Sequence, residues 1–232
     1  MPMFVVSLDG PDFSGKSTIS NLLLEVLREK NRDKEIVFKK TVLPSDLITG
    51  SFTRILRNSA DDVSSNVFAL AYALDHLHHH ETVIEKAVKS DSNIVIVQER
   101  SLLSTLIYQG ILGDVDLKWL KEINKYDKNY PHLSIILKVD LSELLKRKKL
   151  ENRQFDKFEE EEHLKGQIKI YYNLPQDIAS DFHVEYVNAN ESPLEVAKMC
   201  AEKVQREIDK MLEMEEVIPE HTNKKIDSLT SF

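Results

Sequence analysis

Met3-Phe-Val-Val-Ser-Leu-Asp-Gly-Pro-Asp-Phe-Ser-Gly-Lys-Ser-Thr18 carries the strongest structural signal in the chain. Residues 3–9 are mostly apolar and β-branched, which predicts a buried strand that stops at Gly10. From Lys16 onward, apolar residues recur at helical spacing as far as Leu27, so a helix follows. Between them, residues 10–18 fit the pattern G-x-x-x-x-G-K-[ST], a loop whose backbone N–H groups wrap a phosphate.

This loop predicts a binding site for the phosphates of a nucleotide. Lys16 would neutralise the β- and γ-phosphates, and the hydroxyl of Ser17 would complete the coordination shell of Mg²⁺. Glycines avoid Cβ clashes where the loop turns, and the following helix adds the positive end of its dipole. The predicted ATP-binding residues of the loop are Gly10, Phe13, Ser14, Gly15, Lys16, Ser17 and Thr18. A tight strand-to-helix turn with an incidental lysine is the alternative.

Strands and helices alternate along the rest of the chain. Apolar runs predict strands over residues 36–38, 93–97, 132–139 and 182–187, and helical spacing predicts helices over residues 52–56, 65–88, 103–111, 116–126, 141–150, 167–178 (which Pro175 can interrupt) and 193–211. This order predicts an α/β fold with a parallel sheet of about five strands and helices on both faces. We expect one domain over residues 1–212 and a mobile tail over residues 213–232.

The composition narrows the class of protein. Of the 232 residues, 31 are Lys or Arg and 39 are Asp or Glu, so the net charge is -8, which argues against a general nucleic-acid-binding protein. The single cysteine, Cys200, cannot form an intrachain disulfide, and no run approaches the ~20 apolar residues of a membrane span. We therefore expect a cytoplasmic protein with no nucleic-acid or membrane partner.

A charged pair follows the strand predicted over residues 93–97. Glu99 would end that strand at the carboxyl edge of the sheet, where open α/β sheets bind their ligands. With Ser17 and Asp9 it is predicted to hold Mg²⁺ or its waters. Arg100 can bridge the phosphates of donor and acceptor, as phosphoryl transfer requires. A structural ion pair is the alternative for Glu99 and Arg100.

Further motifs follow one another in an order known from one enzyme family. They are Asp9-Gly-Pro-Asp12, Tyr72-Ala-Leu-Asp-His-Leu-His-His79, Glu99-Arg-Ser-Leu-Leu-Ser-Thr-Leu-Ile-Tyr-Gln109, Tyr130-Pro-His-Leu133 with Val139-Asp140, and Asp156-Lys-Phe-Glu159. Together with the phosphate loop they resemble the motifs of thymidylate kinases over residues 3 to about 210. Tyr72 and His76 stand where the family motif has Phe and Arg.

The resemblance implies a P-loop NTPase three-layer fold, a nucleoside-monophosphate kinase domain and a homodimer. It also implies Mg²⁺-dependent transfer of the γ-phosphoryl group of ATP to a deoxynucleoside monophosphate, with dTMP as the favoured acceptor and dTDP as the product. His76 is shorter than the family arginine that donates to thymine O4, and it is mostly neutral near pH 7. We therefore expect dUMP to be a usable acceptor and dCMP a detectable one.

The resemblance also assigns roles in the acceptor site. Asp12 would accept a hydrogen bond from the sugar 3′-hydroxyl, and Tyr72 would stack on the base. Thr105 would face thymine N3, Tyr108 would crowd the 2′ position, and Arg54 is the candidate for the acceptor phosphate. The implied substrate-binding residues are Asp12, Arg54, Tyr72, His76, Arg100, Thr105, Tyr108 and Gln109.

A basic segment over about residues 146–160 is similar to the lid of the family. Thymidylate kinases supply a catalytic arginine from the phosphate loop or from the lid, and here Phe13 occupies the loop position. The lid is therefore expected to supply the charge. The predicted catalytic residues are Lys16, Arg100 and Arg153, and Arg147 and Lys157 are predicted to contact ATP. A solvated helix face is the alternative for residues 146–149.

Other functions stay open at this point. A deoxynucleoside kinase is the first, because Glu99-Arg-Ser101 is nearer to the motif of that family. An inactive nucleotide-binding homologue is the second, although Lys16 and Ser17 are intact. A GTPase is disfavoured, because Asn124-Lys-Tyr-Asp127 has the letters N-K-x-D but falls in a helical pattern. His76 and His80 share a helix face, yet no third metal ligand is evident.

Overall fold

The phosphate loop joins a buried strand to a helix in the computed structural model, as predicted: β1 is Met3–Asp9 and α1 is Lys16–Lys30. The structure describes residues 3–59, 62–89, 93–127, 130–151 and 160–217. Gly10 and Gly15 lie at the two turns of the loop with φ angles of 141° and 92°, which residues with a Cβ rarely adopt. A Cβ on Gly10 would also come within 3.0 Å of the Leu137 carbonyl oxygen.

The other elements continue the alternation of helices and strands. They are β2 (Ile36–Val42), α2 (Ile48–Arg57), α3 (Ser65–His79), η1 (His80–Ile84), α4 (Glu85–Val88), β3 (Asn93–Glu99), α5 (Leu102–Thr105), η2 (Leu106–Ile111), α6 (Leu117–Ile123), β4 (Leu133–Lys138), α7 (Leu141–Leu150), α8 (Glu161–Tyr171), α9 (Gln176–Ala179), β5 (Val184–Asn188) and α10 (Pro193–Val217).

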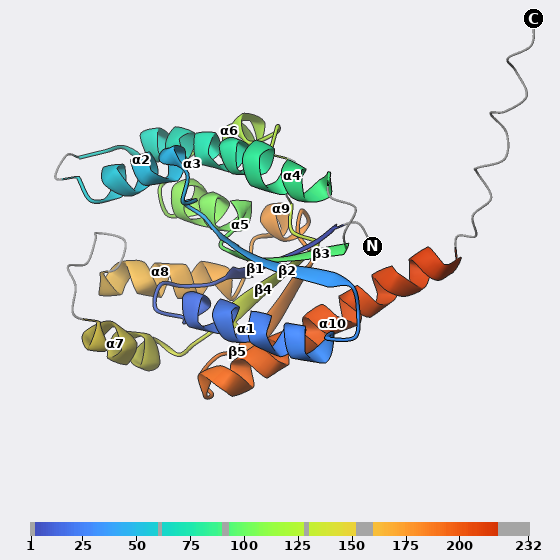
Figure 1. The fold of residues 1–232 in the computed structure, drawn as a ribbon. Coiled ribbons are helices and arrows are strands. Elements are labelled where there is room, and N and C mark those ends of the chain that lie inside the picture. The colour runs from blue at the N-terminus through green and yellow to red at the C-terminus, as the bar shows by residue number, and fades with distance from the viewer. Residues whose placement is uncertain (1–2, 60–61, 90–92, 128–129, 152–159, 218–232) are drawn as a thin grey trace, which may run out of the picture.

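The strands form one parallel sheet in the order β2-β3-β1-β4-β5 (Figure 1). The predicted α/β fold with about five parallel strands is thereby confirmed. The register pairs both Leu8 of β1 and Val42 of β2 with Glu99 of β3. The carboxyl ends of these three strands therefore meet at one edge of the sheet, beside the phosphate loop.

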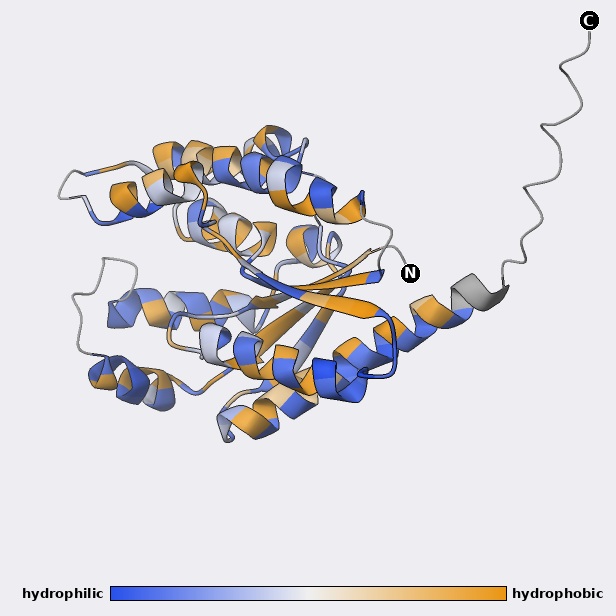
Figure 2. Ribbon diagram, viewed as in Figure 1, coloured by the Kyte–Doolittle hydropathy of each residue, from blue (hydrophilic) through white to orange (hydrophobic). Residues whose placement is uncertain are grey.

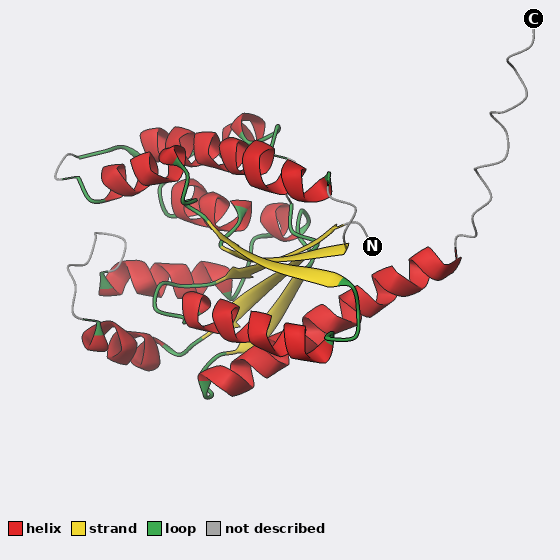
Figure 3. Cartoon of the chain, in the orientation of Figure 1, coloured by secondary structure: helices red, strands yellow, loops and turns green. Residues whose placement is uncertain are grey.

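Helices cover both faces of the sheet (Figure 3). Side chains of β1 alternate between the faces: Phe4 and Val6 pack in a core that includes α1 and α10, whereas Val5 packs with Ile84 of η1. Figure 2 shows apolar residues along the strands and on one side of most helices. This pattern is typical of a parallel sheet buried on both faces.

Two helical regions contain π-helical stretches that the sequence analysis did not predict. The helix predicted over residues 65–88 is helical throughout, but His80–Ile84 is a π-helix between α3 and α4. Residues Leu106–Ile111 form a second π-helix, which carries Tyr108 and Gln109. Such stretches often occur at functional sites.

Some predicted boundaries were wrong. The helix predicted over residues 167–178 begins earlier, at Glu161, and is interrupted near Pro175 as expected: α8 ends at Tyr171, and α9 begins directly after Pro175. The last helix continues to Val217, so the predicted tail begins in helix, and residues 218–232 lie outside the described residues. Within the described ranges, each helix is too short or too polar to span a lipid bilayer.

Candidate active site

Lys16 is buried inside the phosphate loop. Its Nζ donates to the carbonyl oxygens of Gly10 (3.0 Å) and Pro11 (2.7 Å) and lies 3.3 Å from the Ser14 hydroxyl oxygen. Burial, followed by repulsion from Arg100, lowers the pKa of the Lys16 ammonium to about 7. A phosphate in the loop would favour the charged form, because an opposite charge nearby stabilises an ammonium ion.

The Glu99 carboxylate lies beside the loop at the end of β3. It accepts hydrogen bonds of 2.6 Å from the hydroxyls of Ser17 and Ser20, and its Oε1 lies 2.5 Å from Lys40 Nζ. Burial would raise the pKa of Glu99, but the bonds from Lys40, Ser17 and Ser20 outweigh burial and lower it. Ser17 and Glu99 thus place hydroxyl and carboxylate oxygens side by side, and Mg²⁺ prefers such ligands.

Asp9 faces a different part of the structure. Its fully buried carboxylate accepts hydrogen bonds from the Ser101 backbone N–H (3.2 Å), the Ser101 hydroxyl (2.9 Å) and the Ser104 hydroxyl (2.8 Å). These bonds hold the segment after Arg100 against the end of β1. The prediction that Asp9 holds the metal does not fit this arrangement, so we assign Asp9 a positioning role.

Arg100 and Asp12 form a buried ion pair between β3 and the phosphate loop. The guanidinium donates to Asp12 Oδ1, and the Tyr108 hydroxyl donates to Oδ2 at 3.0 Å. Burial would raise the pKa of Asp12, but the charges of Arg100, Lys16 and Arg57 lower it to about 2. Arg100 has a φ angle of 65°, a strained conformation of the kind found at functional sites.

A cleft of about 710 Å³ runs from the phosphate loop toward α2, a volume within the range of ligand-binding sites. It brings together these predicted residues: Asp12, Phe13, Gly15, Lys16, Ser17, Thr18, Arg54, Glu99, Arg100 and Arg147. Arg147 of α7 is held beside the loop, because it donates to the Ser14 carbonyl oxygen at 3.2 Å and to that of Ala189 at 2.8 Å. Arg153 and Lys157 lie outside the described residues.

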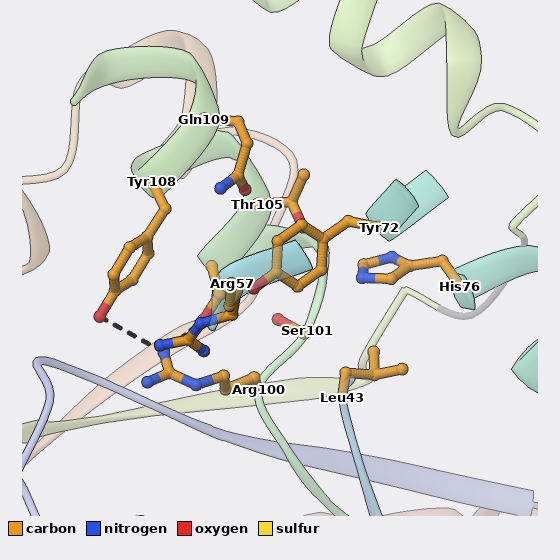
Figure 4. A pocket seen from close by; sticks show the side chains of 10 residues that line it. Leu43, Arg57, Tyr72, His76, Arg100, Ser101, Thr105, Tyr108 and Gln109 are labelled. Atoms are coloured by element: carbon orange, nitrogen blue, oxygen red, sulfur yellow. Dashed lines mark hydrogen bonds between the residues drawn. The ribbon is translucent and has the colours of Figure 1, made fainter. Parts of the chain in front are cut away.

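A smaller inner pocket lies beside this cleft, and Figure 4 shows the side chains that line it. Leu43, Arg57 and Arg100 line both cavities, so the two lie next to each other. The inner pocket brings together five residues predicted to bind the acceptor nucleotide, namely Tyr72, His76, Thr105, Tyr108 and Gln109. Figure 4 shows the rings of Tyr72 and His76 opposite the helix that carries Thr105 and Gln109.

Arg54 is used to hold a loop together. Its guanidinium donates to the carbonyl oxygens of Pro44 (2.9 Å) and Ser45 (2.7 Å). Arg57, one helical turn later, lines both cavities and lies close enough to Asp12 to lower its pKa. Arg57 is therefore better placed than Arg54 to meet an acceptor phosphate. The sequence could have suggested this residue, because it lies about one helical turn after Arg54.

The sequence analysis also missed two buried partners of site residues. Gln167 of α8 accepts from the Asp12 backbone N–H at 2.8 Å and donates to its carboxylate at 3.2 Å. Asp127 lies 3.2 Å from Nδ1 of His76. In the described part of the chain, no group of three or more His, Cys, Asp or Glu side chains could hold a metal ion.

Arg57 and Arg100 line both the cleft at the phosphate loop and the pocket beside it. This arrangement fits a P-loop kinase, which positions and neutralises the phosphates of a donor and an acceptor. The sequence model of the thymidylate kinase family matches residues 8–200, and the chain belongs to this family of ATP-dependent nucleoside-monophosphate kinases.

Relatives with this family name match nearly their whole length. The chain is 31% identical over 212 residues to a probable thymidylate kinase of Pyrococcus abyssi, covering 88% of this chain and 97% of the relative. It is 26% identical over 209 residues to a thymidylate kinase of Maridesulfovibrio salexigens, covering 86% and 94%. The crystal structure of thymidylate kinase from Ehrlichia chaffeensis has the same fold, with a TM-score of 0.61 at 21% identity over 87% of this chain and 98% of that one.

Proposed function

We propose that this protein transfers the γ-phosphoryl group of ATP to dTMP, giving ADP and dTDP. The position of the inner pocket next to the cleft, with Leu43, Arg57 and Arg100 shared between their linings, is the observation that carries this proposal. Arg57 and Arg100 lie where the two cavities join, which is where the phosphates of donor and acceptor would meet. The similarity to the thymidylate kinases of Pyrococcus abyssi (a probable one) and Maridesulfovibrio salexigens supports dTMP as the acceptor.

The donor site would work mainly by positioning and charge neutralisation, which suffice for phosphoryl transfer. The Lys16 ammonium would exchange its bonds to the loop carbonyl oxygens for bonds to the phosphates of ATP. Arg147 would contact the nucleotide at the loop. Ser17 and Glu99 would hold Mg²⁺, which neutralises the charge on the phosphates when bound. Lys40, which neutralises Glu99 in the structure, would then share that carboxylate with the metal.

The acceptor site would hold the base in the inner pocket. Tyr72 would stack on the base, while Thr105, Gln109 and His76 would offer polar atoms to its edge. Asp12 would accept from the sugar 3′-hydroxyl, and the charges of Arg100, Lys16 and Arg57 outweigh its burial and keep it ionised. Tyr108 would crowd the 2′ position and favour deoxyribose.

The lid would complete the site from residues outside the described ranges, with Arg153 as the proposed catalytic arginine and Lys157 as a further contact of ATP. We take residues 1–212 as the kinase domain and propose a cytoplasmic homodimer that binds no nucleic acid. Exposed apolar side chains form a stripe on each of two neighbouring helices: Ile48, Phe52 and Ile55 on α2, and Val67, Leu70 and Leu74 on α3. Such an exposed apolar face supports a protein–protein contact there.

Acceptor choice tests the proposed function against the deoxynucleoside kinase alternative. We expect ADP release to depend on dTMP, with dUMP slower, dCMP detectable and thymidine inactive. A coupled ADP-release assay with each acceptor at equal concentration measures this. Phosphorylation of thymidine without phosphorylation of dTMP would contradict the proposal.

The acceptor phosphate site is tested by comparing two arginines one turn apart. We expect Arg57→Ala to raise the KM for dTMP by about 10- to 100-fold and to leave the KM for ATP nearly unchanged, since a charge-assisted hydrogen bond to phosphate is lost. Arg54→Ala is the matched control and should mainly lower the melting temperature, because it releases the loop at Pro44 and Ser45. The opposite pattern would return the role to Arg54.

A further inference from the structure

His76 is the one histidine among the residues that line the inner pocket. Its side chain is buried, and Figure 4 shows the far edge of its ring pointing from α3 toward Tyr72. At the near edge, Nδ1 lies 3.2 Å from Oδ2 of Asp127, which is itself buried. Asp127 is not among the residues to which the proposed function assigns a role.

The position of Asp127 is set by the turn after α6. Asn124 ends that helix, and its carbonyl oxygen accepts from the Asp127 backbone N–H at 2.9 Å. This turn brings the Asp127 carboxylate against α3. The segment 124–127, which has the letters of a guanine-binding motif, thus serves to place a carboxylate behind His76.

The carboxylate determines which nitrogen of His76 carries a proton. An ionised carboxylate only accepts hydrogen bonds, so Nδ1 carries its proton whether the ring is neutral or charged. The proton that the ring gains or loses is therefore on Nε2, at the edge that faces the pocket. In the neutral ring Nε2 accepts a hydrogen bond, and in the charged ring it donates one.

We propose that Asp127 fixes His76 in the Nδ1–H form, and that protonation of Nε2 selects the acceptor base. The charged ring donates to a keto oxygen, such as O4 of thymine, whereas the neutral ring accepts from an amino group, such as that of cytosine. A histidine nitrogen accepts or donates a hydrogen bond according to its protonation, so the pH dependence of the base preference tests the proposal. The inference rests on the proposed function, because it concerns the acceptor of the same reaction.

Other titratable groups surround His76 without replacing it. Burial, followed by repulsion from His76, lowers the pKa of His79 to about 4, so His79 is neutral above pH 6. His80 of η1 has its Nδ1 3.9 Å from the other oxygen of Asp127, but it does not line the pocket. The Asp75 carboxylate of α3 accepts hydrogen bonds from Ser45 and Thr49.

The groups across the pocket keep one charge state in this range of pH. Arg57 and Arg100 remain cationic, because a guanidinium is not deprotonated in proteins. Burial raises the pKa of the Tyr108 hydroxyl well above its usual value, so it stays neutral. A change of base preference between about pH 6 and 8.5 would therefore report on His76.

The test compares kcat/KM for dTMP and dCMP between about pH 6 and 8.5. Both acceptors carry the same phosphate and sugar, so titration of these groups and of the catalytic residues cancels in the ratio. We expect the preference for dTMP over dCMP to fall about tenfold as the pH rises, the effect of exchanging one hydrogen bond. A ratio that does not change with pH in an active enzyme would overturn the inference and leave the proposed function intact.

Three variants assign the effect to particular residues. The amide of Asp127→Asn can donate to Nδ1, which lets the neutral ring carry its proton on Nε2, so the preference for dTMP should persist at high pH. His76→Gln cannot titrate, and its ratio should be independent of pH. His80→Gln is the matched control on the other oxygen of Asp127 and should keep the wild-type profile. If the dTMP-to-dCMP ratio became independent of pH in His80→Gln but not in His76→Gln, the role of His76 would be contradicted.

A second measurement does not depend on activity. The ring ¹⁵N shifts of the free protein, assigned by the signals missing in His76→Gln, should show the neutral His76 ring protonated at Nδ1. Protonation at Nε2 would overturn the inference whatever the kinetics. Failure to phosphorylate either monophosphate would instead refute the proposed function, and base selection with it.

Discussion

Replacing Lys16 by alanine is expected to lower kcat for transfer from ATP to dTMP by ~10³-fold or more. The Lys16 ammonium lies inside the loop and would neutralise the phosphates, to which the loop otherwise offers backbone N–H groups. The fold should survive, because α1 packs in the core through other side chains, while the loop loses the bonds from Lys16 to the Gly10 and Pro11 carbonyl oxygens. Steady-state kinetics measure the loss, and Lys39→Ala, at an exposed position on β2, is the control.

The stability of the Lys16→Ala variant follows from the lowered pKa of Lys16. The folded-state pKa is about 7 and the ordinary value 10.5, so the unfolded chain binds more protons between these values. The charged lysine therefore lowers the stability of the wild type at pH 7 and below, and this cost disappears as the pH rises to 10.5. We expect the variant to melt at pH 7 no lower than the wild type. Near wild-type turnover would contradict the assignment of the loop.

Replacing Glu99 by glutamine is expected to lower kcat by ~10²- to 10³-fold and to raise the Mg²⁺ concentration needed for half-maximal rate. Glutamine keeps the size of the side chain but removes the negative charge that the metal or its waters would contact. A titration of rate against Mg²⁺ at saturating ATP measures both effects. Glu29→Gln, at an exposed position of α1, should leave both values unchanged.

The same substitution should reduce stability at neutral pH. The pKa of Glu99 is lowered in the folded protein, so its charge stabilises the fold above the ordinary value of 4.5 and this contribution is lost on acidification through the folded-state pKa. The melting temperatures of wild type and variant should therefore converge in acid. An unchanged Mg²⁺ requirement together with this stability loss would make Glu99 a purely structural residue.

The phosphate loop and the strands could be predicted because their signals are local. Glycine spacing, an apolar run and a helical period determine β1, the loop and α1 within residues 3–30. The motif around Glu99 likewise placed Tyr108 and Gln109 on one side of the inner pocket. Tyr72 and His76 of α3 meet them there as the resemblance implied.

Contacts between distant segments could not be predicted in this way. Gln167 lies 155 positions from Asp12, and Asp127 lies 51 positions from His76, so no periodicity links either pair. The place of Asp9 at the end of β1 suggests the metal, but the sequence did not indicate that the hydroxyls of Ser101 and Ser104 donate to its carboxylate. The π-helices escaped prediction because their apolar spacing differs little from that of an α-helix.

The fate of the γ-phosphoryl group tests the proposed reaction most directly. ATP labelled at the γ-phosphorus is incubated with dTMP, Mg²⁺ and the protein, and the products are separated and identified by mass and label. The account predicts that the label moves to the β-phosphorus of dTDP and that Lys16→Ala abolishes this transfer. Label recovered only as inorganic phosphate, or no label in dTDP from the intact protein, would contradict it.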